Sequence, residues 1–332
     1  MPRLFVGNFD FEHRFGREGT LPRHLVEINA ALAPVWATIA DDGDAVWTPT
    51  PIDLAIFDRL ARQRLPRLTP VAEPQMLDRE FEFVFWGENE WARSAAQRWG
   101  RTWLGCEPDI VRRVNSRRFK FELERRFDVL PDGAALVGNV EELATALTLQ
   151  ANDGWVLKAE FGGAGREVRF GAGPPSKQDL AWASNRFRQG VVVTVERRLE
   201  RLDEAGIQFH VERNGDVVCL GVTPLLTRPT GGYLGSGFDD EPQLCIDWAQ
   251  AVEVGRRVAE AVAAEGYFGP LGIDAMRYRD AAGAIRVRPL QDLNARYTMG
   301  GLALGLRRFP AFAAASQGVF RIDEFRARFV GL

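Results

Sequence analysis

The sequence predicts an N-terminal α/β domain followed by two α+β subdomains that are built on antiparallel sheets. Strands and helices alternate over about the first hundred residues, a pattern typical of a parallel sheet. From residue 155 onward, apolar runs are separated by short glycine turns, as in the hairpins of antiparallel sheets. The 332 residues also exceed one average domain of ~150 residues. We therefore expect three units, residues 1–108, 109–196 and 197–332.

In the first unit, apolar and β-branched runs predict strands, and apolar residues at helical spacing predict helices. The expected strands are 3–8, 35–39, 45–47 and 81–87, and the expected helices are 22–33, 52–63 and 90–99. The first 108 residues are therefore expected to form the small α/β layer.

In the second unit we expect a helix capped by Asn115 or Ser116 and a helix over 140–150. We also expect a hairpin of strands 155–160 and 161–170, and a strand over 191–196. In the third unit, the turn at 213–216 predicts a hairpin of strands 207–212 and 217–222. A mobile glycine-rich segment (229–237), a long helix (245–265) and strands 271–278 and 285–290 are expected after it.

Composition excludes several classes of function. A net charge of −3 and an isoelectric point near 5.8 argue against nucleic-acid binding, which needs a clustered basic face. No apolar run is long enough for a secretory signal or a transmembrane helix, so no membrane association is expected. The three cysteines are far apart in the sequence and form no disulfide framework, so we expect a cytoplasmic protein.

Lysine is rare in this chain, and one lysine stands before a glycine turn. Of 42 basic residues only Lys120, Lys158 and Lys177 are lysines. Lys158 lies on a strand and is followed by Gly162-Gly163-Ala164-Gly165, which places an ammonium group beside accessible backbone amides. Such a combination suits a polyphosphate, although a plain hairpin with a solvated lysine explains the pattern equally well.

The strand 193–196 ends in Glu196 and runs into a charged stretch that contains Arg197, Leu199 and Asp203. Extended backbone at such a point can offer N–H and C=O groups to a purine ring, and a carboxylate further on can accept ribose hydroxyls. A strand followed by a charged surface segment is the simpler interpretation of this stretch taken alone.

The most specific pattern lies near the C-terminus. Asp274 lies on one expected strand, and Asp292, Asn294 and Arg296 alternate along the next. Side chains at positions i and i+2 of a strand face the same way, so Asp292 and Asn294 share a face that Asp274 can join. Two carboxylates and an amide oxygen are hard ligands that suit Mg²⁺. Arg296 is placed to meet an anion beside them.

The order of these pieces over residues 110–310 resembles the ATP-grasp superfamily, which includes D-alanine–D-alanine ligase, biotin carboxylase and glutathione synthetase. The resemblance implies ATP with Mg²⁺ or Mn²⁺ as cofactors, a small grasp subdomain (109–196) carrying the glycine-rich loop, and a C-terminal subdomain (197–332) carrying the metal site. The implied nucleotide-binding residues are Arg117, Lys158, Gly162, Gly163, Glu196, Arg197, Leu199 and Asp203. The implied metal ligands are Asp274, Asp292 and Asn294, and the implied catalytic residues are Arg296 and Lys158.

Three departures from the family pattern are visible, and one is that the glycine turn is compact. Asp292 stands where the family usually has a glutamate, which is one methylene longer. The first phosphate-binding lysine of the family is replaced by Arg117, and Lys120, one helical turn later, is the competing candidate.

The resemblance implies an ATP-dependent ligase that joins a small-molecule carboxylate to an amine through an acyl phosphate, releasing ADP and phosphate. Arg228, in the segment 227–237, and Arg296, in 296–301, are the expected substrate contacts. A small-molecule kinase on the same fold and a non-catalytic ATP-binding protein remain alternatives. A dinucleotide-dependent oxidoreductase is disfavoured because no glycine fingerprint follows the first strand. Members are often dimeric, so a homodimer is also an expectation.

Overall fold

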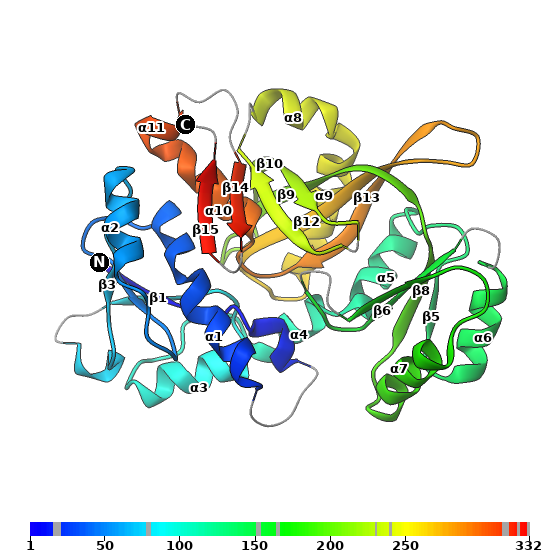
Figure 1. The fold of residues 1–332 in the computed structure, drawn as a ribbon, viewed down its shortest axis with the longest axis horizontal. Coiled ribbons are helices and arrows are strands. Elements are labelled where there is room, and N and C mark those ends of the chain that lie inside the picture. Colours follow the sequence, from blue (N-terminus) through cyan, green and yellow to red (C-terminus); the bar gives the residue numbers. More distant parts are fainter. Residues whose placement is uncertain are drawn as a thin grey trace.

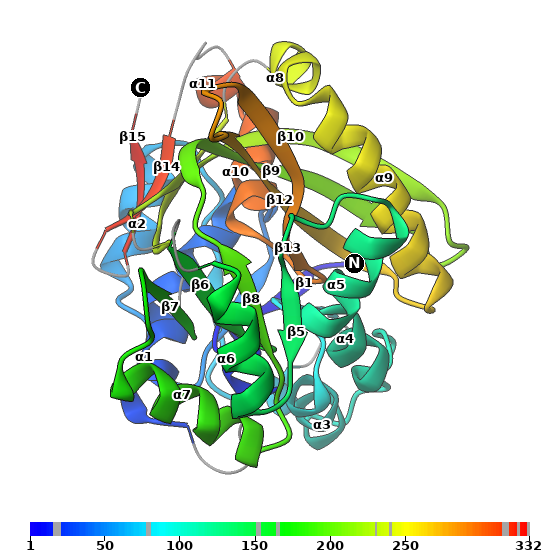
Figure 2. The ribbon, with the colours of Figure 1, turned by 90° about the vertical axis from the view of Figure 1, so that its right-hand side faces the viewer.

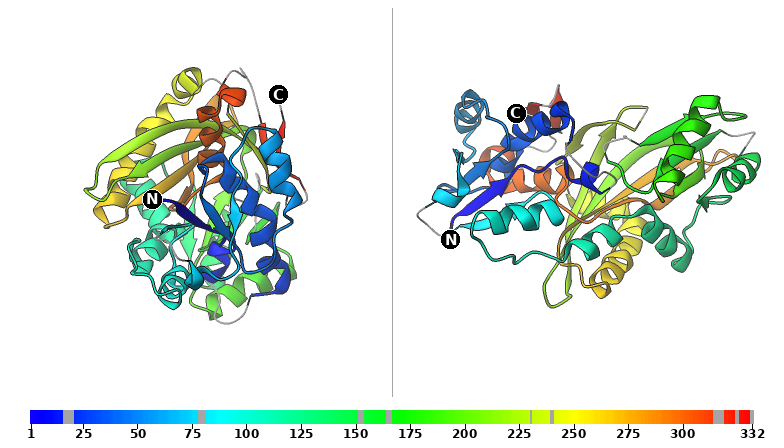
Figure 3. Two further views of the ribbon diagram at one scale, coloured as in Figure 1. Left: turned by 90° about the vertical axis from the view of Figure 1, so that its left-hand side faces the viewer. Right: turned by 90° about the horizontal axis from the view of Figure 1, so that it is seen from below.

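The three sheets of the computed structural model occupy three successive stretches of the chain (Figure 1). The structure describes residues 1–15, 21–77, 81–150, 154–163, 167–229, 231–238, 241–313, 319–323 and 326–330. Seen from below in Figure 3, the N-terminal sheet and the sheet of the middle segment lie at opposite ends of the molecule, with the C-terminal sheet between them. The sheets match the α/β and α+β fold class predicted from the sequence.

The N-terminal sheet is parallel, as the alternation of strands and helices predicted. Its order is β3-β2-β1-β4, and the strands are β1 (Arg3–Val6), β2 (Ala45–Trp47), β3 (Thr69–Pro70) and β4 (Glu82–Phe85). Its helices are η1 (Phe11–Arg14), α1 (Arg23–Leu32), η2 (Ala33–Thr38), α2 (Ala55–Arg62), η3 (Pro74–Met76) and α3 (Glu90–Arg98). The carboxyl ends of β1 and β4 lie side by side, which brings η1 next to the start of α3.

One predicted strand of this unit was wrong. Residues 35–39 belong to the 3₁₀-helix η2 and the residue after it, and every residue of η2 is buried. A short apolar run that is buried on all sides has the same composition in a strand and in a helix, so periodicity does not separate the two. Pro34 at the start of the run favours the helical form, because its ring fixes φ and it has no N–H to offer a neighbouring strand.

The sheet of the middle segment is antiparallel with the order β5-β8-β6-β7. Its strands are β5 (Ala135–Val137), β6 (Trp155–Ala159), β7 (Val168–Gly171) and β8 (Val193–Arg197). Helices α6 (Val140–Thr148) and α7 (Lys177–Arg188) cover one face (Figure 2) and close a separate core around Trp155 and Trp182. The predicted hairpin of β6 and β7 is confirmed, and residues 164–166 of its turn lie outside the described residues.

The C-terminal sheet has the order β13-β12-β9-β10-β11-β14-β15, and all its pairs are antiparallel. Its strands are β9 (Glu200–Val211), β10 (Val217–Thr227), β11 (Tyr233–Gly237), β12 (Gly269–Arg279), β13 (Ile285–Asn294), β14 (Val319–Asp323) and β15 (Arg326–Val330). Its helices are α8 (Glu241–Asp247), α9 (Ala249–Ala264), α10 (Met299–Gly305), η4 (Leu306–Arg308) and α11 (Pro310–Ala313).

Two predictions for this unit need correction. The long helix expected over 245–265 is divided into α8 and α9 at Trp248, which is buried and has a non-helical backbone conformation. The segment 229–237, expected to be a mobile loop, contains strand β11, which pairs with β10 and β14. Its second partner lies some eighty residues further along the chain, so local sequence carries no signal for that pairing.

Helices α4 (Pro108–Val114) and α5 (Arg117–Arg126) connect the units. Ser116 caps α5 by accepting a hydrogen bond from the backbone N–H of Phe119, as predicted. Side chains of both helices join the large core that the N-terminal domain shares with the C-terminal sheet, rather than the small core of the middle segment. α5 therefore lies against β13, where it can reach the predicted metal residues. Among the described residues, no helix is long and apolar enough to cross a membrane.

Candidate nucleotide and metal site

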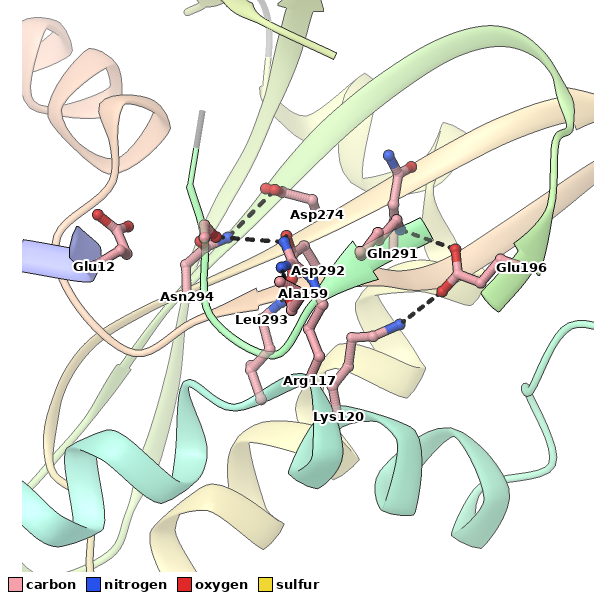
Figure 4. Close-up of polar contacts among 12 residues, drawn as sticks. Glu12, Arg117, Lys120, Ala159, Glu196, Asp274, Gln291, Asp292, Leu293 and Asn294 are labelled. Atoms are coloured by element: carbon pink, nitrogen blue, oxygen red, sulfur yellow. Dashed lines mark hydrogen bonds and ion pairs between the residues drawn. The ribbon is translucent and has the colours of Figure 1, made fainter. Parts of the chain in front are cut away.

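The predicted metal residues meet on one face of the C-terminal sheet. Asp274 on β12 stands directly opposite Asp292 on β13, and Asn294 lies two residues further along the same face. The Asn294 side-chain amide donates a hydrogen bond to Asp274 Oδ2 at 3.3 Å (Figure 4). Strand alternation and cross-strand pairing therefore bring together the three side chains that the sequence singled out.

The two aspartates have opposite electrostatic surroundings. Burial, together with the neighbouring carboxylates of Asp292 and Glu204, raises the pKa of Asp274 to about 7. Burial also acts to raise the pKa of Asp292, but the cations Arg117 and Lys158 nearby hold it below its ordinary value. Arg296 offsets this rise only in part, so the Asp274 side of the pair has less compensating positive charge than the Asp292 side.

A divalent cation would supply the missing positive charge. The available ligands also suit Mg²⁺, which binds carboxylate and amide oxygens. Among the described residues, no group of three or more His, Cys, Asp or Glu side chains forms a metal cluster. The candidate set consists of only two carboxylates with an amide, so phosphate oxygens and water would have to complete the coordination, as is usual for Mg²⁺.

Arg117 links the metal residues to the glycine turn. From the first turn of α5, its guanidinium donates to Asp292 Oδ2 at 3.0 Å and to the carbonyl of Ala159 at 2.5 Å. A longer bond of 3.3 Å reaches the carbonyl of Gly162. Arg117 is only 4% exposed, so this cation is held in a fixed position beside Asp292 and the described part of the glycine-rich turn.

Lys158 lies in a buried network of charges. Its ammonium is 2.9 Å from Glu196 Oε2, and the same carboxylate receives two hydrogen bonds from Arg288 at 2.7 and 2.8 Å. Lys120 lies 3.6 Å from Glu196 (Figure 4). It also lies 2.9 Å from Glu124. Burial lowers the pKa of Lys158, whereas Arg288, Lys158 and Lys120 hold the pKa of Glu196 well below its ordinary value despite burial.

This network separates the two candidates for the first phosphate-binding cation. The Lys120 side chain is 1% exposed and lies between the carboxylates of Glu124 and Glu196. Arg117 instead lies beside Asp292 and the glycine turn. Of the two candidates, Arg117 is therefore the one that lies beside the predicted metal residues, and Lys120 belongs to the interior network.

Arg296 lies at the boundary with the N-terminal domain. Its Nε donates to the carboxylate of Glu12, Nη2 donates to Asn294 Oδ1 at 2.9 Å, and Nη1 donates to the carbonyl of Tyr297 at 2.8 Å. The guanidinium also lies over the ring of Trp86, 5.4 Å from its centroid. Arg296 therefore adjoins the metal residues, as expected, and is held there by a carboxylate from the other domain.

The expected adenine hinge lies at the end of β8. Arg197 pairs with Trp155 of β6, Leu199 follows in the connection to β9, and the Glu196 side chain is committed to the buried network. Nucleotide binding by Glu196, Arg197, Leu199, Gly162 and Gly163 stays a prediction.

Two predicted residues are not brought to this cluster. Asp203 faces the opposite side of β9, where it accepts a hydrogen bond of 2.7 Å from Arg277. Its neighbour Glu204 is on the site face and accepts a bond of 2.7 Å from Gln291. Arg228 is exposed at the end of β10. Both positions follow from strand registers that the sequence does not reveal.

Sequence reasoning also missed residues that complete the cluster. Glu12 is 284 positions from Arg296, and Arg288 is 92 positions from Glu196. Neither belongs to a recognisable motif, so only the tertiary contact identifies them. The rarity of lysine was the one useful signal, since Lys120 and Lys158 both belong to the charge network while Lys177 is exposed.

Comparison with solved structures shows which known fold this chain shares. The chain matches N5-carboxyaminoimidazole synthetase from Staphylococcus aureus with a TM-score of 0.55 and 10% identity, covering 96% of this chain and 81% of that one. A complex of the same synthetase with ADP matches with a TM-score of 0.52 and 12% identity, covering 90% and 71%. Biotin carboxylase from Campylobacter jejuni, solved as a β-γ-ATP complex, gives 0.52 and 12%, covering 98% and 77%.

These proteins are ATP-grasp enzymes, and the chain has the ATP-grasp fold. No family model matches the sequence, and no curated protein matches it. At identities of 10–12% the likeness shows the fold alone, so the chemistry has to be argued from this chain's own residues.

Proposed function

We propose that this protein is an ATP-dependent ligase that joins a carboxylate to an amine through an acyl phosphate, with release of ADP and phosphate. One observation carries the proposal. Asp274, Asp292 and Asn294 share a face of the C-terminal sheet, and Arg117 reaches that face from α5 beside the glycine turn. The proposed metal ligands and the proposed phosphate-binding cation thus lie together, although they come from different elements.

The chain's own residues supply the charges that phosphoryl transfer requires. Arg117 and Lys158 would hold phosphate oxygens, and Arg296 would hold the acceptor carboxylate in line with the transferred group. Transfer of a phosphoryl group needs positioning and charge neutralisation rather than a covalent protein nucleophile. Asp274, Asp292 and Asn294 would hold Mg²⁺, which neutralises charge on the phosphates when it is bound.

The fold supports the same reaction class, since the similar enzymes include a synthetase and a biotin carboxylase solved with nucleotides. Small-molecule carboxylates and amines are the substrates proposed here. A homodimer, and the roles of Arg197, Leu199 and Arg228, remain predictions.

Release of ADP tests the proposal. Purified protein with Mg·ATP and pooled amino acids is expected to form ADP and phosphate together with an amide product, detected by mass spectrometry. Asp292→Ala should abolish this reaction, whereas the control Asp42→Ala, in an exposed turn, should not. Release of AMP would contradict the acyl-phosphate scheme. A stable phosphorylated product formed without an amine would identify a kinase instead, and binding without turnover in every pool would indicate a non-catalytic protein.

A further inference from the structure

Glu12 is a largely buried carboxylate that the proposed function has not yet used. It lies on η1, immediately beyond the carboxyl end of β1. Ligands of open α/β sheets bind at this edge of the strands. The loop is firmly placed, because Asn8 donates to the carbonyl of Gly87 at 2.8 Å and accepts from the backbone N–H of Trp86 at 2.8 Å, tying the ends of β1 and β4 together.

Glu12 is directed toward the other two units. Its carboxylate accepts a hydrogen bond from Arg296, and the two side chains are 14% and 11% exposed. A methyl group built on Gly163 would lie 3.0 Å from the carboxyl carbon of Glu12, so this carboxylate also lies against the glycine turn. In Figure 4 it stands on the Asn294 side of the cluster, away from Lys120 and Glu196.

Glu12 therefore lies between the residue proposed to hold the acceptor carboxylate and the turn proposed to cover the phosphates. A carboxylate at that point repels both anions and attracts a cation. When the acceptor carboxylate binds Arg296, Glu12 loses its present hydrogen-bond partner. The remaining reactant, an amine, is a cation in neutral water, and it must also lose protons before it can attack a carbonyl carbon.

We propose that Glu12 binds the ammonium group of the amine substrate and accepts its proton. This inference rests on the proposed ligase function. One proton passes from the ammonium to a carboxylate oxygen of Glu12, and the nitrogen lone pair forms the C–N bond at the acyl carbon. The bond between that carbon and the phosphate oxygen breaks, and phosphate leaves with the electron pair. The second N–H proton leaves with the phosphate.

Competition between two nucleophiles tests the role of Glu12. Hydroxylamine is uncharged at neutral pH and traps acyl phosphates as hydroxamates, whereas amino acids in the pool react through an ammonium group. In Glu12→Gln the ratio of amide to hydroxamate is expected to fall by about tenfold or more, as expected for loss of a hydrogen bond to a charged group. The loss should appear in KM for the amine as well as in kcat.

Matched variants make the result decisive. Glu12→Asp keeps the charge and should recover part of the ratio, and Glu27→Gln, on α1 of the same domain, should behave as wild type. An unchanged ratio of amide to hydroxamate in Glu12→Gln would overturn the inference. If both products fall equally, Glu12 serves only to hold Arg296. If the wild-type protein forms neither hydroxamate nor ADP, the ligase function itself fails and the inference falls with it.

Discussion

The guanidinium of Arg117 lies 3.0 Å from the carboxylate of Asp292, although 175 positions separate the two residues in the sequence. A cation proposed to hold phosphate is therefore paired with a proposed metal ligand. On binding, the pair would separate, because the metal would bind Asp292 and the phosphates would bind Arg117. Binding of the nucleotide and binding of the metal should accordingly support each other.

Loss of Arg117 should weaken nucleotide binding. Arg117→Ala is expected to lower the affinity for Mg·ADP by about tenfold to a hundredfold, because charge-assisted hydrogen bonds are lost. Isothermal titration calorimetry with ADP and Mg²⁺ measures the change. Arg118→Ala, the exposed neighbour on α5, is the control and should retain wild-type affinity. A loss in Lys120→Met, with Arg117→Ala unaffected, would show that Lys120 is the phosphate-binding cation after all.

Removing the charge of Glu196 should destabilise the protein. Glu196→Gln leaves Lys158 without its paired carboxylate and leaves Lys120 and Arg288 with Glu124 alone. Removing one partner of a buried ion pair costs about 3–5 kcal/mol of unfolding free energy, because the other charge stays buried and uncompensated. Urea unfolding followed by circular dichroism gives this value. Glu200→Gln, at an exposed carboxylate, should change little, and similar values for both variants would refute the role of the network.

Stability should also depend on pH through Glu88, which follows β4. Burial raises the pKa of Glu88 to about 7, above the ordinary value of 4.5, and the hydrogen bond from the backbone N–H of Cys106 offsets this only in part. The folded state thus binds a proton more tightly than the unfolded state does. The stabilising contribution of Glu88 to the unfolding free energy is complete below about pH 4.5 and is lost as the pH rises through about 7.

The unfolding free energy measured at several pH values tests this dependence. In Glu88→Gln, the pH-dependent contribution of Glu88 to the unfolding free energy, a few kcal/mol at most, should be absent. The same pH profile in the variant and the wild type would mean that Glu88 does not titrate in this range.

A methyl group at Gly163 should disturb Glu12 more than it disturbs the fold. The backbone there has an ordinary conformation, but the added carbon would lie 3.0 Å from the Glu12 carboxyl group. Gly163→Ala should therefore lower the ratio of amide to hydroxamate while the unfolding free energy changes by less than about 1 kcal/mol. Gly138→Ala, where the added carbon would lie 3.9 Å from Glu142 Oε2, is the control. A ratio equal to that of the wild type would place the reacting amine elsewhere.

The sequence by itself determined the local features of this protein. Alternating strands and helices predicted the parallel N-terminal sheet, and glycine turns between apolar runs predicted the hairpins. Strand alternation was enough to place Asp292 and Asn294 on one face, because the period of a strand is a property of the backbone.

Tertiary structure alone decided the long-range relationships. The partner strand of β11, the pairing of Glu12 with Arg296 and the entry of Arg288 into the network join segments far apart in the chain. Register decided that Glu204, rather than Asp203, faces the predicted metal residues, since a shift of one residue reverses every side chain of a strand. Such contacts arise from the packing of whole units, which no local pattern of residues encodes.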